Sequence, residues 1–153
     1  MMSDFIIKPI NLDLYLSLQT TSEECVGRWI TADSNPGYPC RVSLREAKVG
    51  ERVLLTHYLH HNVHSPYRAS GPIFIIEDAK PADLGVNEIP EVLKTRLISL
   101  RAYSAKGDML SAKIAQGKSV RQTLSELFNH KEVDYVQLHN ANPGCFSCEA
   151  RRV

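Results

Sequence analysis

The stretch that decides the fold is RLISLRAYSAKGDMLSAKIAQGKSVRQTLSELFNH, residues 96–130. In residues 96–104, Ile, Leu and Ala alternate with Ser, Arg and Tyr, which is the period of a strand with two different faces. Lys106-Gly107 is typical of a tight turn, and residues 109–115 can return beside the first strand. The segment therefore predicts an antiparallel hairpin.

A helix is predicted directly after the hairpin, over residues 119–130. Apolar side chains recur there at helical spacing and form a single stripe, which indicates a helix with one buried face. Ser119 followed by Gln122 has the pattern of a capping box at the helix start. The stripe consists of Val120, Leu124, Leu127 and Phe128.

Outward from this segment, the remaining chain reads mainly as strands and turns. Residues 61–71 are expected to be a loop, residues 22–24 one helical turn, and Pro90 the start of another. Residues 72–76 are apolar on both faces, which favours a central strand. Further extended segments are expected at 5–7, 28–32, 40–44, 52–60 and 133–140, with an edge strand at 145–153.

These elements predict one α+β domain over residues 1–153. The expected architecture is a mainly antiparallel sheet of about five to seven strands with the helix 119–130 packed on it. The chain has 153 residues, of which 43% are hydrophobic and 23% charged, as is usual for one globular domain.

Charge and leader patterns exclude several classes of protein. Lysine and arginine total 18 against 17 acidic residues, a formal net charge of +1, so no nucleic-acid partner is expected. Residues 1–20 lack a basic region followed by an unbroken apolar run, and no window is apolar enough for a membrane helix. We therefore expect a cytoplasmic protein without a membrane partner, in which the cysteines are free thiols. They are Cys25, Cys40, Cys145 and Cys148.

Two groups of metal-type residues are present, but neither predicts a metal site. His57 and His61 would share one face of a regular strand and His60 the other, so they cannot all converge on one ion. Cys145 and Cys148 have the spacing of half a zinc site, but no second pair exists. No metal and no cofactor are expected, and a metal-binding domain is the weakest of the alternatives considered.

The loop before residues 72–76 concentrates hydrogen-bonding groups. Arg68 could bind a carboxylate or phosphate in a bidentate manner, with Tyr67 and Ser70 beside it. Equally, Arg68 could pair with an acidic side chain of its own protein, and the sequence leaves both readings open.

The sharpest local cluster is His139-Asn140 with Cys145. A thiol nucleophile requires a base within hydrogen-bond reach and a group that orients the base. A turn at residues 142–144 could return Cys145 towards His139, and Asn140 could orient the base or stabilise an oxyanion. Strand alternation, however, puts His139 and Asn140 on opposite faces, and a cysteine is often a small buried hydrophobic residue.

Four segments together resemble a bacterial family filed as a domain of unknown function, number twelve hundred and three, over nearly the whole chain. They are PGYPCR at 36–41, SPYRASGP at 65–72, LISLRAY at 97–103 and HNANPGC at 139–145. The resemblance implies a bacterial protein of one compact domain and implies no activity. The polar residues at its motif positions are Cys40, Arg41, Tyr67, Arg68, Ser70, Arg101, His139, Asn140 and Cys145.

The first functional hypothesis is a pocket that binds, and in one version also processes, a small anionic ligand. His139 and Cys145 would supply acid–base or nucleophilic groups. Ligand-binding candidates are Arg41, Tyr67, Arg68, Ser70, Arg101 and Asn140. The alternative is a non-enzymatic interaction domain that forms a homodimer through an exposed strand edge.

Overall fold

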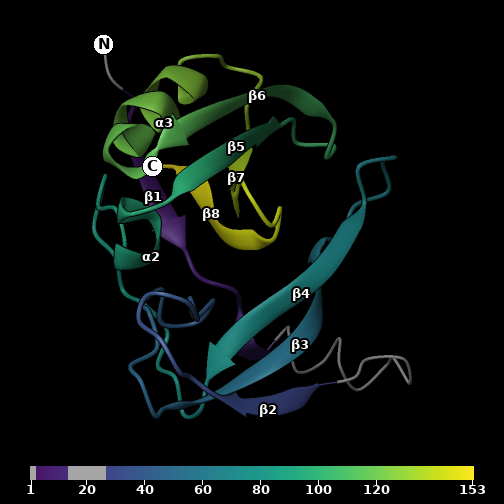
Figure 1. Cartoon of the computed structure of the whole chain (residues 1–153). Helices are drawn as coiled ribbons and strands as arrows, with labels where there is room; N and C mark the ends of the chain where they lie inside the picture. The colour runs from purple at the N-terminus through teal and green to yellow at the C-terminus, as the bar shows by residue number, and fades with distance from the viewer. Residues whose placement is uncertain (1–2, 14–26) are drawn as a thin grey trace.

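The computed structural model describes residues 3–13 and 27–153, whose strands form a five-stranded and a three-stranded sheet (Figure 1). The larger sheet has the order β1-β8-β7-β5-β6, and the smaller has the order β2-β3-β4. The larger sheet contains β1 (Phe5–Lys8), β5 (Leu97–Tyr103), β6 (Met109–Gln116), β7 (Tyr135–Asn140) and β8 (Phe146–Arg152). The smaller contains β2 (Arg28–Thr31), β3 (Arg52–His61) and β4 (Ala69–Ile76).

The helices are short, and the main one lies in the C-terminal half as predicted. Those that lie wholly within the described residues are α2 (Glu91–Lys94), the 3-10 turn η1 (Gly117–Ser119) and α3 (Val120–Phe128). The antiparallel α+β prediction is confirmed at this level, and β5 and β6 form the predicted hairpin. The strands divide between two sheets, however, because the larger sheet must be covered on both faces and α3 covers only one of them.

The start of α3 differs from the predicted capping box. The side chain of Ser119 makes no capping hydrogen bond, and its backbone is already in the helical region. The reason is that η1 leads directly into α3, so the free N–H groups of an isolated helix start do not arise there. Gly117 is needed for close packing, since a Cβ there would lie 2.1 Å from the carbonyl oxygen of Leu93.

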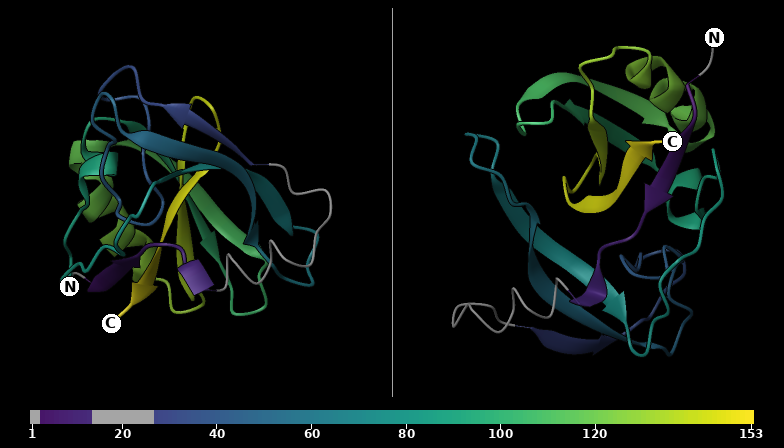
Figure 2. Two further views of the ribbon diagram at one scale, coloured as in Figure 1. Left: turned by 90° about the horizontal axis from the view of Figure 1, so that it is seen from below. Right: turned by 180° about the vertical axis from the view of Figure 1, so that it is seen from behind.

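Strand order departs from expectation at both sheets. The C-terminal strand β8 is no edge strand but lies between β1 and β7, which brings both ends of the described chain together (Figure 2). Strand β4 is no central strand but an edge of the smaller sheet, which suits Pro72 because proline cannot donate to a further strand. A single parallel bridge from Cys40 to Phe74 covers part of that edge.

Residues 40–44 also differ from the predicted extended segment. Only Cys40 makes a bridge; residues 41–43 form a turn, and Leu44 has a positive φ of 54°. The backbone N–H of Leu44 donates to the carbonyl of Cys40 at 3.1 Å and closes this turn. The predicted helical turn at residues 22–24 lies outside the described residues.

The larger sheet has two different faces, and the position of the site follows from this. One face is apolar and packs against α3 through residues such as Leu124 and Leu138, both 0% exposed. The other carries Tyr135, Gln137 and His139 and faces the smaller sheet. Figure 2 shows the larger sheet lying between α3 and the smaller sheet.

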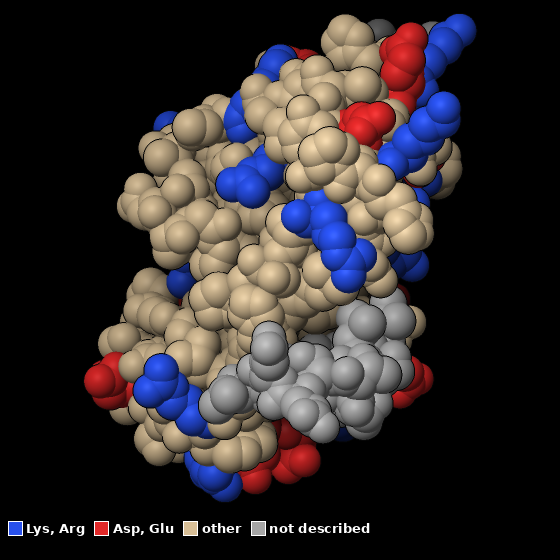
Figure 3. Space-filling view, turned by 90° about the vertical axis from the view of Figure 1, so that its right-hand side faces the viewer, with Lys and Arg blue, Asp and Glu red and all other residues tan. Residues whose placement is uncertain are grey.

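The surface and helices add two observations. On the face in Figure 3, lysine and arginine side chains are separated by uncharged residues, and acidic side chains lie near both ends. Within residues 3–13 and 27–153, none of the helices has the length and apolar character required to cross a membrane.

Candidate functional site

The first component of the candidate site is the turn that carries Arg41. The Arg41 N–H donates to the carbonyl of Phe74 in β4 at 3.0 Å, and its own carbonyl accepts from Ile10 N–H at 3.2 Å. The sulfur of Cys40 accepts the N–H of Ile76 at 3.3 Å. These contacts fix the backbone on both sides of Arg41, so that its side chain leaves the turn in one direction.

The second component is the turn between β7 and β8. Asn140 N–H donates to the carbonyl of Cys145 at 2.9 Å, and Gly144 N–H donates back to the carbonyl of Asn140 at 2.8 Å. Gly144 has a φ of +81°, a left-handed conformation that glycine adopts without a steric penalty. The turn places Cys145 next to the side chain of Asn140.

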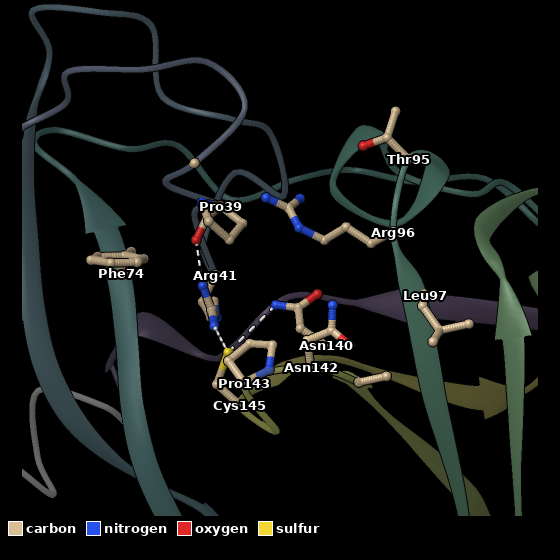
Figure 4. Close-up of a pocket in the computed structure, with 12 residues that line it drawn as sticks. Pro39, Arg41, Phe74, Thr95, Arg96, Leu97, Asn140, Asn142, Pro143 and Cys145 are labelled. Atoms are coloured by element: carbon tan, nitrogen blue, oxygen red, sulfur yellow. Dashed lines mark hydrogen bonds between the residues drawn. The ribbon is translucent and has the colours of Figure 1, made fainter.

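Arg41 and Cys145 meet although 104 residues separate them in the sequence. The Nη2 of Arg41 donates to the sulfur of Cys145 at 3.1 Å, and Asn140 Nδ2 donates to the same sulfur at 3.5 Å (Figure 4). Arg41 Nε and Nη1 donate to the carbonyls of Phe146 at 2.6 Å and Pro39 at 2.5 Å. The guanidinium therefore joins the two turns, with the thiol at their junction.

The Arg41 guanidinium is a buried cation without a carboxylate. The residue is 1% exposed, and among the described residues no acidic side chain forms an ion pair with it. Burial lowers the pKa of Arg41 from its usual value, and the neighbouring Cys145 acts in the opposite direction. Because a buried charge requires a partner to offset lost hydration, this guanidinium is suited to an anion.

A pocket of about 430 Å³ opens over this junction. Arg96 extends into it in Figure 4, and its guanidinium pairs with the buried carboxylate of Glu46. The amide oxygen Oδ1 of Asn140 is buried and has no hydrogen-bond partner among the described residues. The lining residues are Gly37, Pro39, Arg41, Phe74, Thr95, Arg96, Leu97, Asn140, Ala141, Asn142, Pro143 and Cys145.

His139 and Arg101 do not line this pocket. They lie on the face of the larger sheet that meets the smaller sheet, and His139 Nδ1 donates to the carbonyl of Gly144 at 3.0 Å. Burial, reinforced by the positive charge of Arg101, lowers the pKa of His139 to about 3. The ring is thus neutral near pH 7, and its hydrogen bond is to a carbonyl and not to the thiol of Cys145.

The histidines of β3 show an effect of tertiary structure on the alternation pattern. A bulge between Tyr58 and His61 shifts the register, so His60 and His61 both face the larger sheet. His60 Nδ1 donates to Gln137 Oε1 at 3.0 Å, and His61 Nε2 accepts the hydroxyl of Tyr135 at 2.6 Å. The expectation that His57 shares the face of His61 is wrong, because His57 is exposed and His61 is buried.

Tyr67, Arg68 and Ser70 lie away from the pocket: Tyr67 and Arg68 are in the loop between β3 and β4, and Ser70 is in β4, which begins at Ala69 within the segment predicted as a loop. Arg68 Nη1 donates to the side chain of Asn62, and Ser70 Oγ lies 2.9 Å from His57 Nε2. The carbonyl of Tyr67 accepts from His61 Nδ1 at 2.7 Å. Of the candidates named from sequence, the structure brings together Arg41, Asn140 and Cys145.

Metal and thiol chemistry can also be placed. Within residues 3–13 and 27–153, no group of three or more histidine, cysteine or acidic side chains is arranged to hold a metal ion. Cys148 is 0% exposed in the apolar core, and burial raises the pKa of its thiol to about 12. The two cysteines are therefore in different surroundings: Cys148 lies in the core, and Cys145 lines the pocket.

Arg96 is a pocket residue that sequence reasoning missed. The sequence pattern predicts that it opens the alternating strand, but β5 begins at Leu97, so the alternation does not fix the direction of the Arg96 side chain. Only its distant partner Glu46, itself 6% exposed, shows that the side chain turns inward. No local signal in the sequence could have identified this pair.

Comparison with known proteins gives one match. A family model described as "Protein of unknown function (DUF1203)" matches residues 37–152, which include both turns of the site. No curated protein and no solved structure matches the chain. The resemblance in the sequence segments is confirmed, and the chain belongs to the family "Protein of unknown function (DUF1203)".

Proposed function

We propose that the pocket binds a small anionic ligand, with Arg41 as its principal charge partner. The observation that carries the proposal is a guanidinium that is 1% exposed, has no carboxylate partner among the described residues and lies at a pocket. A bound anion would supply the missing partner, as carboxylates and phosphates do for arginine elsewhere.

The charges around the pocket favour a ligand with a single negative charge. Arg96 is already paired with Glu46, so these two side chains contribute no net charge. Arg41 remains, and its nearest ionisable neighbour is the thiol of Cys145. One uncompensated positive charge is matched by one negative charge, whereas a doubly charged ligand would leave one of its charges without a partner.

The remaining side chains suit a ligand larger than a simple ion. A volume of about 430 Å³ lies within the range of small-molecule sites. Asn140 Nδ2 would donate a hydrogen bond to the ligand, and Phe74 and Leu97 supply apolar walls. In this proposal Arg101 and His139 support the adjoining sheet face. The protein acts in the bacterial cytoplasm, where structural disulfides are rare.

The proposal is tested by anion titration with a matched pair of variants. Calorimetry with formate, acetate, glycolate and phosphate should detect binding to the wild type, strongest for the monoanions. Cys145→Asp places a carboxylate beside Arg41 and should raise the melting temperature and abolish binding. Cys145→Asn introduces a side chain of nearly the same shape as aspartate but without its charge, and this variant should keep binding the anion. Absence of binding by the wild type, or equal binding by both variants, would contradict the proposal.

A second candidate function is self-association through β6. This strand is an edge of the larger sheet, and its side chains Leu110 and Ile114 are 47% and 68% exposed. An unpaired edge with exposed apolar side chains can pair with the same edge of a second copy. Sedimentation should then show a dimer that Ile114→Lys converts to a monomer; a monomeric wild type would exclude this.

A further inference from the structure

The sulfur of Cys145 has surroundings that suit an anion. In both of its side-chain hydrogen bonds, from Arg41 Nη2 at 3.1 Å and Asn140 Nδ2 at 3.5 Å, the sulfur is the acceptor. An adjacent guanidinium interacts more favourably with a thiolate than with a neutral thiol, and the thiolate is the nucleophile in cysteine chemistry. Cys145 is also only partly buried and lines the pocket, so a small molecule can reach it.

Asn140 supplies an independent indication of a ligand at the same sulfur. The residue is 5% exposed, its Nδ2 is directed at Cys145, and its Oδ1 has no partner among the described residues. An unsatisfied buried acceptor is unfavourable unless a donor reaches it. A carboxylate cannot donate a hydrogen bond, whereas a molecule with an O–H group can both donate to Oδ1 and accept from the neighbouring N–H groups.

We propose that Cys145 is a site of oxidation by hydrogen peroxide or a small organic hydroperoxide. Both oxidants carry an O–H donor together with oxygen acceptors, as the arrangement of Asn140 and Arg41 requires. Attack by the thiolate needs no general base at the sulfur. This agrees with a site in which His139 is hydrogen-bonded to the carbonyl of Gly144.

The step balances without another reactant. The Cys145 thiolate attacks the distal peroxide oxygen, an S–O bond forms and the O–O bond breaks. Sulfur loses two electrons, the peroxide gains them, and the leaving hydroxide or alkoxide takes a proton from water. The product is the sulfenic acid of Cys145, with Arg41 beside the new oxygen.

The described neighbouring cysteines are unsuited to convert this product to a disulfide. Cys40 is 0% exposed, and its sulfur accepts the N–H groups of Ser43 and Ile76. Cys148 is also 0% exposed and lies in the apolar core. Neither Cys40 nor Cys148 is therefore expected to form a disulfide with the sulfenic acid, which a small external thiol can reduce.

This inference does not rest on the anion-binding function, although the two share Arg41. A thiolate and a bound anion would compete for one guanidinium, so a bound monoanion should slow oxidation. Anion binding without peroxide reactivity would overturn only this inference, and peroxide reactivity without anion binding would overturn only the proposed function.

The test is sulfenic acid trapping in folded protein. A Cys25→Ser background removes the cysteine outside the described residues, and the protein is treated with hydrogen peroxide and dimedone at neutral pH. Peptide mass spectrometry should find the dimedone adduct at Cys145 and not at Cys40 or Cys148, which serve as internal controls. No adduct at Cys145, equal labelling of all three cysteines or a disulfide product would each overturn the inference.

A charge variant tests the role of the neighbouring groups. Asn140→Asp keeps the side-chain shape but places a carboxylate next to the sulfur, where Asn140 Nδ2 now donates to it, and it should slow peroxide consumption by about tenfold or more. Arg41→Lys should slow it also, if the variant folds. An unchanged rate in a folded Asn140→Asp protein would contradict the inference whatever the outcome for Arg41→Lys.

Discussion

Leu138 and Gln137 are adjacent in β7, are 0% and 1% exposed, and lie on opposite faces of the larger sheet. Leu138 belongs to the apolar cluster under α3. Gln137 holds His60 on the smaller sheet through two hydrogen bonds, to its ring at 3.0 Å and to its carbonyl at 2.7 Å. Two side chains of one strand are thus equally buried, one by apolar packing and the other by hydrogen bonds.

The difference concerns what each face requires. The face under α3 is stabilised by removal of apolar surface from water, which is non-directional and depends mainly on shape and volume. The face towards the smaller sheet buries imidazole, amide and phenol groups, each of which must find a partner in a defined direction. Stability on the second face should therefore respond to pH and to isosteric changes.

The largest effect is expected from Leu138→Ala. Truncation of a fully buried leucine leaves a cavity under α3 and should lower the free energy of unfolding by about 2–5 kcal/mol. Urea denaturation at pH 7 measures this, and Leu138→Met is the volume-matched control, with a loss below about 1.5 kcal/mol. Similar losses for both variants would mean that the apolar face is not governed by volume.

Gln137→Leu tests the opposite face at nearly constant volume. It removes both hydrogen bonds between Gln137 and His60. The free energy of unfolding should fall by about 2–3 kcal/mol, because the ring nitrogen and the carbonyl of His60 each lose a hydrogen bond. Urea denaturation is again the measurement. A neutral or stabilising result would show that the polar face tolerates apolar substitution as the other face does.

The pH dependence of stability should come partly from His139. Its pKa is about 3 in the folded protein against an ordinary 6.5, so the unfolded chain binds more protons between these values and stability falls as the pH drops below 6.5. The contribution is about 2 kcal/mol between pH 7 and pH 5. Denaturation of wild type and His139→Gln at both pH values checks it; an equal pH dependence in the two proteins would contradict the assignment.

The smallest effect is expected from Tyr135→Phe. The substitution removes the hydrogen bond from the Tyr135 hydroxyl to His61 at 2.6 Å and should cost about 1 kcal/mol. Tyr103→Phe is the control, because it removes a hydroxyl from the ring that stacks on Tyr135 at 5.3 Å and leaves the hydrogen bond to His61 in place. Equal melting temperatures for Tyr135→Phe and wild type would show that this hydrogen bond adds nothing to the sheet contact.

Sequence periodicity located most elements but few contacts of the candidate site. The hairpin of β5 and β6 and the helix α3 follow from spacing over a few residues, and structure bears these out. Asn140 and Cys145 could be linked because only a short turn separates them. The contact between Arg41 and Cys145 spans 104 residues and depends on which strands pair, which no local period specifies.

By itself, the sequence determined the antiparallel α+β character, the position of the main helix and the two faces of β7, because side-chain alternation and helical spacing are local properties of the backbone. Tertiary structure alone decided that the strands divide into two sheets, that β8 lies inside the larger one, and that a bulge turns His60 and His61 the same way. Those outcomes depend on long-range pairing, in which each buried polar group and each apolar face must find a partner elsewhere in the chain.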